Sequence, residues 1–168
     1  MTSYLQYVNT DTTGPRYDVT PLFANHAAFS TLVQELAKPF ETDEIDYVSG
    51  IDALGFILGT ALALHFQVGF IAIRKGGKLP VKTEQISFVD YTGQQKSLEL
   101  QPEAIPTGAR VLLVDEWIET GAQVSAAIAL IEAQAGVVAG IATLNIDDNE
   151  NTRQIQKSYR CGTVWPED

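Results

Sequence analysis

Cysteine is nearly absent from this sequence, since Cys161 is the only one among 168 residues. No disulfide can form within the chain, and a metal site built from several cysteines is excluded. This composition is typical of proteins kept in a reducing compartment, and we therefore expect a cytoplasmic location.

Basic residues are also scarce. The chain has 11 lysines and arginines against 21 aspartates and glutamates, and its formal net charge is -10 at pH 7. Long-range repulsion would oppose binding to nucleic acid or to an anionic membrane, so we expect neither as a partner. A phosphate ligand would have to be held locally by a few cations. The acidity also has a simpler explanation, which is solubility.

Long apolar runs are missing too. The longest one is interrupted by His65 and Gln67, and the N-terminal stretch MTSYLQYVNTDTTGPRYD has neither a basic start nor an apolar core of signal-peptide length. These features predict a soluble intracellular protein.

The sequence does contain a repeated alternation of apolar runs and helical patterns. Short apolar runs indicate buried strands at residues 46–50, 68–74, 110–115, 137–147 and 161–165. Helical patterns occupy residues 27–40, 54–66, 120–134 and 149–160. This order predicts an α/β fold with a doubly wound parallel sheet, and no linker divides residues 1–168 into more than one domain. Residues 82–100, around the turn DYTGQQ, predict a mobile β-hairpin that projects from the main body.

Ligands of such sheets bind beyond the carboxyl ends of the strands, where the loop DEWIETGAQ is placed. Its C-terminal part enters a helix, so the free backbone N–H groups of Thr120, Gly121, Ala122 and Gln123 could bind a phosphate. Asp115 and Glu116 could accept hydrogen bonds from a vicinal diol or help to hold Mg²⁺. Alternatively, Thr120 caps an ordinary helix and the two acids are a solvated strand end.

A second loop, RKGGKLP, gathers Arg74, Lys75 and Lys78 around two glycines. Glycine allows close approach of the backbone, and the three cations could bind a polyphosphate. A basic surface turn is the alternative. A third loop, GIDALG, is a weaker candidate for an anion-binding turn, because glycine is common between a strand and a helix.

In their order and spacing, GIDALGFILGTALAL, FIAIRKGGKLP and LELQPEAIPTGARVLLVDEWIETGAQ resemble the type I phosphoribosyltransferases, and most closely those that act on adenine. The resemblance covers residues 15–147. It implies transfer of phosphoribose from 5-phosphoribosyl-1-pyrophosphate to a purine nitrogen, with Mg²⁺ as cofactor and pyrophosphate as product. It also implies a small N-terminal hood at about residues 1–25, a flexible hairpin that closes over the reaction, and a homodimer.

The same resemblance assigns roles to individual residues. The 5′-phosphate would lie against Glu119, Thr120, Gly121, Ala122 and Gln123. Asp115 and Glu116 would bind the ribose hydroxyls, with Asp115 also a metal ligand. Pyrophosphate would contact Ala53, Leu54, Arg74, Lys75 and Lys78. The base would be bound by Arg16, Tyr17 and Trp117, and Asp90 and Glu119 would be the catalytic groups that handle protons.

The sequence departs from the pattern of the family in four places. Leu54 replaces an arginine that would face pyrophosphate, and Glu116 replaces an aspartate while keeping its charge. Glu119 replaces an alanine beside the phosphate loop, where a carboxylate could either repel phosphate or exchange a proton with the base. Arg16 and Tyr17 stand where Phe-Arg is usual, so recognition of the base could differ.

Two other functions therefore stay open. Leu54 and Glu119 would fit a noncatalytic sensor of phosphoribosyl compounds or nucleotides, and Tyr17 and Trp117 would fit transfer to a different acceptor. Trp117 could equally be a core residue. Trp165, His26 and His65 are expected to be structural.

Overall fold

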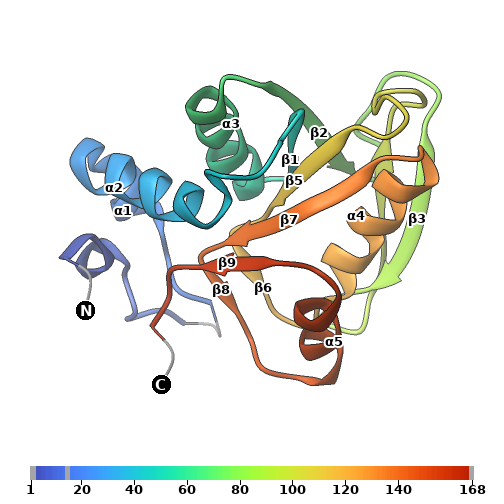
Figure 1. Ribbon diagram of the computed structural model, residues 1–168. Helices are drawn as coiled ribbons and strands as arrows, with labels where there is room; N and C mark the ends of the chain where they lie inside the picture. Colours follow the sequence, from blue (N-terminus) through green and yellow to red (C-terminus); the bar gives the residue numbers. More distant parts are fainter. Residues whose placement is uncertain (1–2, 14–15, 167–168) are drawn as a thin grey trace.

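The computed structural model describes residues 3–13 and 16–166, and its centre is one twisted sheet (Figure 1). The sheet has seven strands in the order β3-β4-β2-β1-β5-β7-β9. The strands are β1 (Tyr47–Ile51), β2 (Gly69–Lys75), β3 (Glu84–Val89), β4 (Gln95–Leu100), β5 (Arg110–Val114), β7 (Val137–Thr143) and β9 (Cys161–Thr163). Strands β2, β1, β5, β7 and β9 are parallel, whereas β3 and β4 are antiparallel additions at one edge. The predicted α/β fold class is confirmed.

Helices cover both faces of the sheet. The five main helices are α1 (Thr20–Ala24), α2 (His26–Ala37), α3 (Leu54–Phe66), α4 (Ala122–Ala133) and α5 (Glu150–Ser158). Successive residues of β5 point to opposite faces. Leu112 and Val114 belong to the core shared with α2 and α3, while Val111 and Leu113 belong to the core shared with α4 and α5. This alternation explains why an uninterrupted apolar run forms a central strand.

The turn between β1 and α3 is packed tightly against the end of β5. A Cβ atom on Gly50 would lie 2.3 Å from the carbonyl oxygen of Gly55, and one on Gly55 would lie 2.7 Å from that of Val114. Only glycine permits these approaches. The turn therefore brings the start of α3 close to the acidic residues that follow β5.

Two predicted elements differ in detail from the structure. The hairpin is an extension of the sheet at its base, because β4 pairs with β2 through Arg74 and Glu99, and α4 packs against β3. The strand expected at residues 137–147 is interrupted at Leu144, whose N–H donates to the carbonyl of Glu116. A separate small sheet of β6 (Trp117–Ile118) and β8 (Asn145–Ile146) follows the interruption.

The N-terminal segment packs beside α2 and α3. It contains a 3₁₀ helix, η1 (Ser3–Tyr7), and returns through an antiparallel bridge between Asn9 and Asp18. A second 3₁₀ helix, η2 (Lys38–Phe40), extends α2. Gly14 and Pro15, at the start of the GPRYDVTPLF motif, lie outside the described residues. Within the described ranges, no helix has the length and apolar character needed to cross a membrane.

Candidate active site

A cavity of about 620 Å³ lies at the carboxyl edge of the parallel strands. It is lined by the turn after β1, the end of β2, the hairpin, the loop between β5 and α4, and the N-terminal segment. The predicted site residues that line it are Arg16, Ala53, Leu54, Lys75, Asp90, Asp115, Glu116, Trp117, Glu119, Thr120, Gly121 and Gln123. The topology thus brings residues from separate loops into one cavity, as expected for this sheet.

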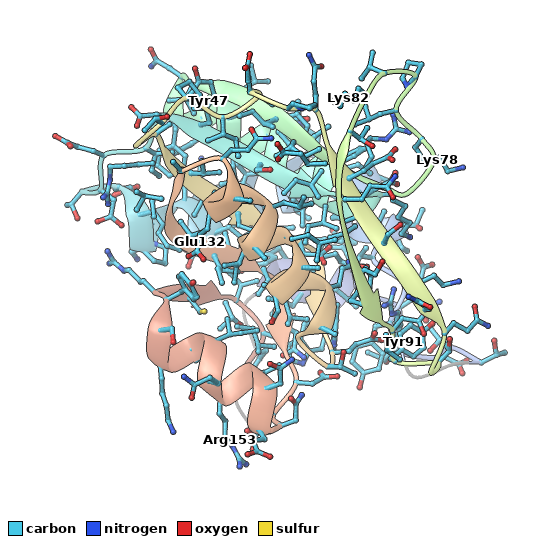
Figure 2. The ribbon with its side chains drawn as sticks, turned by 90° about the vertical axis from the view of Figure 1, so that its right-hand side faces the viewer. Tyr47, Lys78, Lys82, Tyr91, Glu132 and Arg153 are labelled. Atoms are coloured by element: carbon cyan, nitrogen blue, oxygen red, sulfur yellow. The ribbon has the colours of Figure 1, made fainter. Side chains whose placement is uncertain are left out.

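Four predicted site residues do not line this cavity, namely Tyr17, Arg74, Lys78 and Ala122. The Arg74 guanidinium contacts Asp52 at 3.3 Å and lies over the ring of Phe56, 5.9 Å from its centroid. The side chain of Lys78 points away from the body of the molecule (Figure 2). Of the three predicted cations in RKGGKLP, Lys75 alone faces the cavity in this conformation.

The two acids after β5 are nearly buried. Asp115 is 7% exposed, and its carboxylate accepts hydrogen bonds from the backbone N–H of Glu116 at 2.8 Å and the side-chain amide of Gln123 at 2.9 Å. Burial raises the pKa of Asp115 to about 6. Glu116 is 6% exposed, and burial, together with the charge of Asp115, raises its pKa to about 7. Two adjacent carboxylates are therefore held where an incoming cation or a ligand hydroxyl would stabilise their charge.

Glu119 forms an ion pair with Arg16, 103 positions away in the sequence. The pair is bidentate, with Nε to Oε1 at 2.6 Å and the second contact at 2.8 Å. The Arg16 guanidinium also lies 4.9 Å from the ring centroid of Tyr91 at the hairpin tip. Arg16 therefore joins the N-terminal segment, the hairpin and the loop before α4. No sequence pattern predicted this contact, because its partners meet only after the sheet has formed.

The loop RKGGKLP surrounds a buried carboxylate that the sequence analysis did not single out. Glu99 of β4 is 1% exposed and accepts hydrogen bonds from the N–H groups of Gly77, Lys78 and Leu79 at 2.6–3.0 Å. These hydrogen bonds hold the pKa of Glu99 low, at about 2. The backbone donors of this loop are thus satisfied internally, and the cavity receives Lys75 and Gly76 from it.

The comparisons with known proteins agree with this arrangement. A family model described as the phosphoribosyl transferase domain matches residues 21–166, nearly the whole chain. The chain belongs to the phosphoribosyltransferase family. An adenine phosphoribosyltransferase from Xanthomonas oryzae is 43% identical over 99 residues, and one from Bradyrhizobium is 42% identical over 126 residues. The match to the Xanthomonas relative spans 59% of this chain and 53% of that relative, so the chain covers about half of its length. The match to the Bradyrhizobium relative spans 70% of each of the two chains.

Solved structures extend the likeness to the whole fold. The crystal structure of adenine phosphoribosyltransferase from Rhodothermus marinus superimposes with a TM-score of 0.89 at 32% identity, covering 97% of this chain and 96% of that one. The enzyme from Saccharomyces cerevisiae, solved with an imino-altritol bisphosphate and adenine, gives 0.82 at 29% identity, covering 97% and 99%. The predicted resemblance to type I phosphoribosyltransferases, and especially to the adenine members, is confirmed.

The hairpin places Asp90 on the cavity wall. Its Oδ1 accepts hydrogen bonds from the N–H and hydroxyl of Thr92, at 2.9 and 2.6 Å, and from the N–H of Gln94 at 3.0 Å. These bonds lower the pKa of Asp90, first through the Thr92 hydroxyl. In the structure Asp90 therefore organises the turn, and a proton transfer would have to use its other oxygen.

Trp117 is part of an aromatic cluster with Tyr17 and Trp165. The three pairs of ring centroids are 5.4–5.6 Å apart, and the indole N–H of Trp117 donates to Asp147 at 2.8 Å. The indole nitrogen is therefore engaged. Trp117 also lines the cavity, so it is both a packed residue and a possible surface for a base.

Several cavity residues were not among the predicted ligands. They are Asp52, Gly76, Phe88, Tyr91, Gln95, Lys96, Ser97, Ile118 and Val124. Most come from the hairpin, whose side chains could not be assigned to a ligand from alternation alone. Lys96 adds a cation to the cavity that no motif had indicated.

Proposed function

We propose that this protein is a purine phosphoribosyltransferase that transfers phosphoribose from 5-phosphoribosyl-1-pyrophosphate to adenine, forming AMP and pyrophosphate in purine salvage. The observation that carries the proposal is the single cavity shared by the loop before α4, the acidic pair, the end of β2 and the hairpin tip. The relatives named above are adenine enzymes, and the yeast structure was solved with adenine.

The donor would bind across the loops after β5 and β2. The backbone N–H groups of Thr120 and Gly121 would receive the 5′-phosphate, at the positive end of the α4 dipole. The Asp115 and Glu116 carboxylates would accept hydrogen bonds from the ribose hydroxyls. Lys75, exposed at the end of β2, would contact the diphosphate, and Arg74 would have to leave Asp52 to reach it.

The residues present fit a Mg²⁺ ion that arrives with the diphosphate. Among the described residues there is no cluster of three metal-ligating side chains. Among the same described residues, no donor forms a hydrogen bond with the carboxylate of Glu116, and Asp115 lies beside it. Mg²⁺ commonly uses one or two carboxylates together with substrate oxygens. Bound there, the ion would neutralise charge on the leaving diphosphate.

The reaction would depend mainly on positioning and electrostatics. Breaking the bond between the anomeric carbon and the diphosphate builds positive charge on the sugar ring, which the carboxylates of Asp115 and Glu116 would stabilise. The hairpin tip with Asp90 and Tyr91 would exclude water from the reacting centre. Asp90 or Glu119 would hold the proton of the acceptor nitrogen.

The base would lie between the N-terminal segment and the start of β6. Trp117 offers a ring for stacking, and the Arg16–Glu119 pair provides polar atoms at the same wall. Tyr17 would act indirectly, by supporting Trp117. The Arg16–Glu119 ion pair also changes the effect of having an acid where the family has alanine. Arg16 neutralises the Glu119 carboxylate, which would otherwise face a phosphate.

Binding without turnover is a second candidate, and the charge of the cavity favours it. Five carboxylates line the cavity, from Asp52, Asp90, Asp115, Glu116 and Glu119. The only lining cations among the described residues are Arg16, Lys75 and Lys96. Leu54 adds no charge at the start of α3. A sensor could keep such a cavity, whereas an enzyme would need a divalent cation to hold its highly charged donor.

A single assay distinguishes these functions. The protein is incubated with 5-phosphoribosyl-1-pyrophosphate, Mg²⁺ and one nucleobase at a time, and nucleoside monophosphates are detected by mass spectrometry. AMP from adenine supports the proposal, and a different product identifies another acceptor. Calorimetric binding of the donor without any product would instead establish the sensor.

The proposed enzyme would act in the cytoplasm as a homodimer, with residues 1–168 forming one domain and residues up to about 25 forming a hood. The lone cysteine supports the compartment, and the family resemblance supports the dimer. Sedimentation at several protein concentrations would test the dimer directly.

A further inference from the structure

The loop before α4 is held from behind by two asparagine side chains near the start of α5. The side-chain amide of Asn149 donates to the carbonyl oxygen of Glu119 at 2.7 Å, and that of Asn151 donates to the carbonyl oxygen of Thr120 at 2.7 Å. Two successive peptide groups are therefore fixed by the neighbouring helix. Neither asparagine lines the cavity.

Peptide geometry converts these contacts into an orientation for the N–H groups. In a planar trans peptide the C=O of one residue and the N–H of the next point in opposite directions. With the Glu119 and Thr120 carbonyls turned toward α5, the N–H groups of Thr120 and Gly121 point away from α5. Neither N–H has an acceptor within residues 3–13 and 16–166. Thr120 and Gly121 both line the cavity.

The fit between the loop and α5 is close at Gly121. This residue has a φ of 77°, and a Cβ atom there would lie 2.8 Å from the side-chain nitrogen of Asn151 and 2.9 Å from Ile155. Glycine is thus required both by the backbone conformation and by the contact with α5. Ile155 is 5% exposed, so α5 is anchored in the core behind the loop.

The start of α5 is itself rigidly placed. Asn149 is the N-cap, with its Oδ1 accepting from the N–H groups of Asn151 and Thr152, both at 3.1 Å. The Thr152 hydroxyl donates to the carbonyl of Asp147 at 2.6 Å. The hydrogen bonds from Asn149 and Asn151 reach Glu119 and Thr120, which directly precede α4. The first turns of α4 and α5 therefore lie at the same end.

We propose that Asn149 and Asn151 are positioning residues that orient the Thr120 and Gly121 N–H groups toward a phosphate monoester in the cavity. The inference rests on the proposed function, because it concerns the loop assigned to the 5′-phosphate. It adds that α5, which contributes nothing to the cavity wall, sets affinity for the phosphate. Without the two asparagine hydrogen bonds, a binding anion would first have to order two peptide groups, and this entropic cost would weaken its affinity.

The two functions of Asn149 can be separated by substitution. Serine is a good N-cap and is neutral, so Asn149→Ser keeps the cap of α5 while removing the amide that reaches Glu119. Asn151 is exposed, and Asn151→Ala removes its amide without adding charge. Gln156→Ala, also exposed on α5, is the matched control because it removes an amide that has no contact with the loop in the described structure.

The experiment compares ribose 5-phosphate with Mg²⁺-pyrophosphate by calorimetry, in the wild-type protein, the Asn149→Ser/Asn151→Ala double variant and the control. We expect the double variant to bind ribose 5-phosphate about tenfold or more weakly, since two hydrogen bonds that fix the loop are lost. Pyrophosphate binding and Tm should stay close to wild type. In NMR spectra of the wild type, the Thr120 and Gly121 amide protons should shift downfield with ribose 5-phosphate.

Each other outcome overturns a defined claim. Unchanged affinity of the double variant for ribose 5-phosphate would refute the positioning role and leave the proposed function intact. An equal loss of affinity for ribose 5-phosphate and for pyrophosphate, together with a lower Tm, would also refute the positioning role. The asparagines would then stabilise the fold in general. Absence of ribose 5-phosphate binding to the wild type would overturn both the positioning role and the assignment of this loop to the 5′-phosphate.

Discussion

Glu119 is the residue at which the chain departs most sharply from the phosphate loop of its family, and Arg16 changes the meaning of that departure. An unpaired carboxylate next to the N-terminus of α4 would compete with a phosphate for the same N–H groups. In the bidentate pair its charge is balanced at 2.6 and 2.8 Å. The two residues should therefore be considered as one unit in any account of affinity.

A double-mutant cycle tests this unit. Arg16→Met should weaken ribose 5-phosphate binding roughly threefold to tenfold, since it leaves the Glu119 carboxylate uncompensated. In a Glu119→Gln background the same substitution should have little effect, because no charge remains to be balanced. Calorimetry at constant ionic strength measures the four affinities. Additive effects of the two substitutions would show that the pair does not neutralise the loop.

The pKa values of the acid pair predict how stability depends on pH. Burial raises the folded-state pKa of Glu116 to about 7, above its usual value in an unfolded chain. The folded state then binds more protons than the unfolded state between about pH 4 and pH 7, so stability decreases as pH rises through this range.

The substitution Glu116→Gln should remove the part of this dependence that comes from Glu116, while the part from Asp115, whose pKa burial raises to about 6, should stay. At pH 8 we expect the variant to be more stable than wild type, on the order of 2 kcal/mol, and at pH 4 nearly equal to it. The change loses no hydrogen bond, because the Glu116 carboxylate has no donor among the described residues. Urea unfolding at both pH values provides the measurement. If the variant were stabilised to the same extent at pH 8 and at pH 4, titration of Glu116 would not be the cause of the pH dependence.

At the scale of elements, the loop after β2 depends on a carboxylate supplied by β4. Glu99→Gln should lower Tm and weaken pyrophosphate binding, because an amide can accept from fewer of the three N–H groups and brings donors of its own. Hydrogen exchange at Gly77, Lys78 and Leu79 should become faster. Glu103→Gln, at an exposed position of the next turn, is the control. Unchanged exchange in the Glu99 variant would contradict this role.

The start of α3 offers a second test at this scale. Leu54 lines the cavity, so Leu54→Arg should place a cation there and tighten pyrophosphate binding about tenfold, the equivalent of roughly 1.4 kcal/mol. Ile57→Arg introduces the same charge one turn later, at a residue that is 44% exposed and does not line the cavity. Equal affinities of the two folded variants would show that Leu54 does not face the diphosphate.

At the scale of the whole molecule, the segments around Tyr17 and Trp165 meet next to Trp117 of the cavity wall. Tyr17 packs against Trp165, and both contact Trp117. Figure 1 shows the blue N-terminal segment and the red stretch after β9 on the same side of the molecule. The cluster therefore links the proposed hood to the sheet.

Trp165→Ala should destabilise the fold by about 2 kcal/mol. This is less than the loss of a fully buried tryptophan would cost, because Trp165 is only partly buried. Loss of this ring should also change the fluorescence of Trp117. Urea unfolding and emission spectra measure the two effects, with Tyr7→Ala as a control at an exposed aromatic residue of the N-terminal segment. A stability equal to that of the control would show that the cluster does not join the two segments.

Local patterns were sufficient for the elements that are stabilised locally. The apolar run of β5, the helix from Leu54 to Phe66 and the turn into α4 were all predicted, because each depends on neighbouring residues and on burial on both faces. The break at Leu144 and the pairing of β4 with β2 were not predicted. Both depend on hydrogen bonds to strands that are distant in the sequence.

By itself, then, the sequence determined the α/β class, the family and the loops that reach the carboxyl edge of the sheet, because periodicity and motif spacing are properties of consecutive residues. Which side chains of those loops enter the cavity was set by the folded structure. It turned Lys78 away, paired Arg74 with Asp52 and Arg16 with Glu119, and placed Asn149 and Asn151 behind the loop before α4. These contacts join residues far apart in the chain, and their geometry exists only when the strands are assembled.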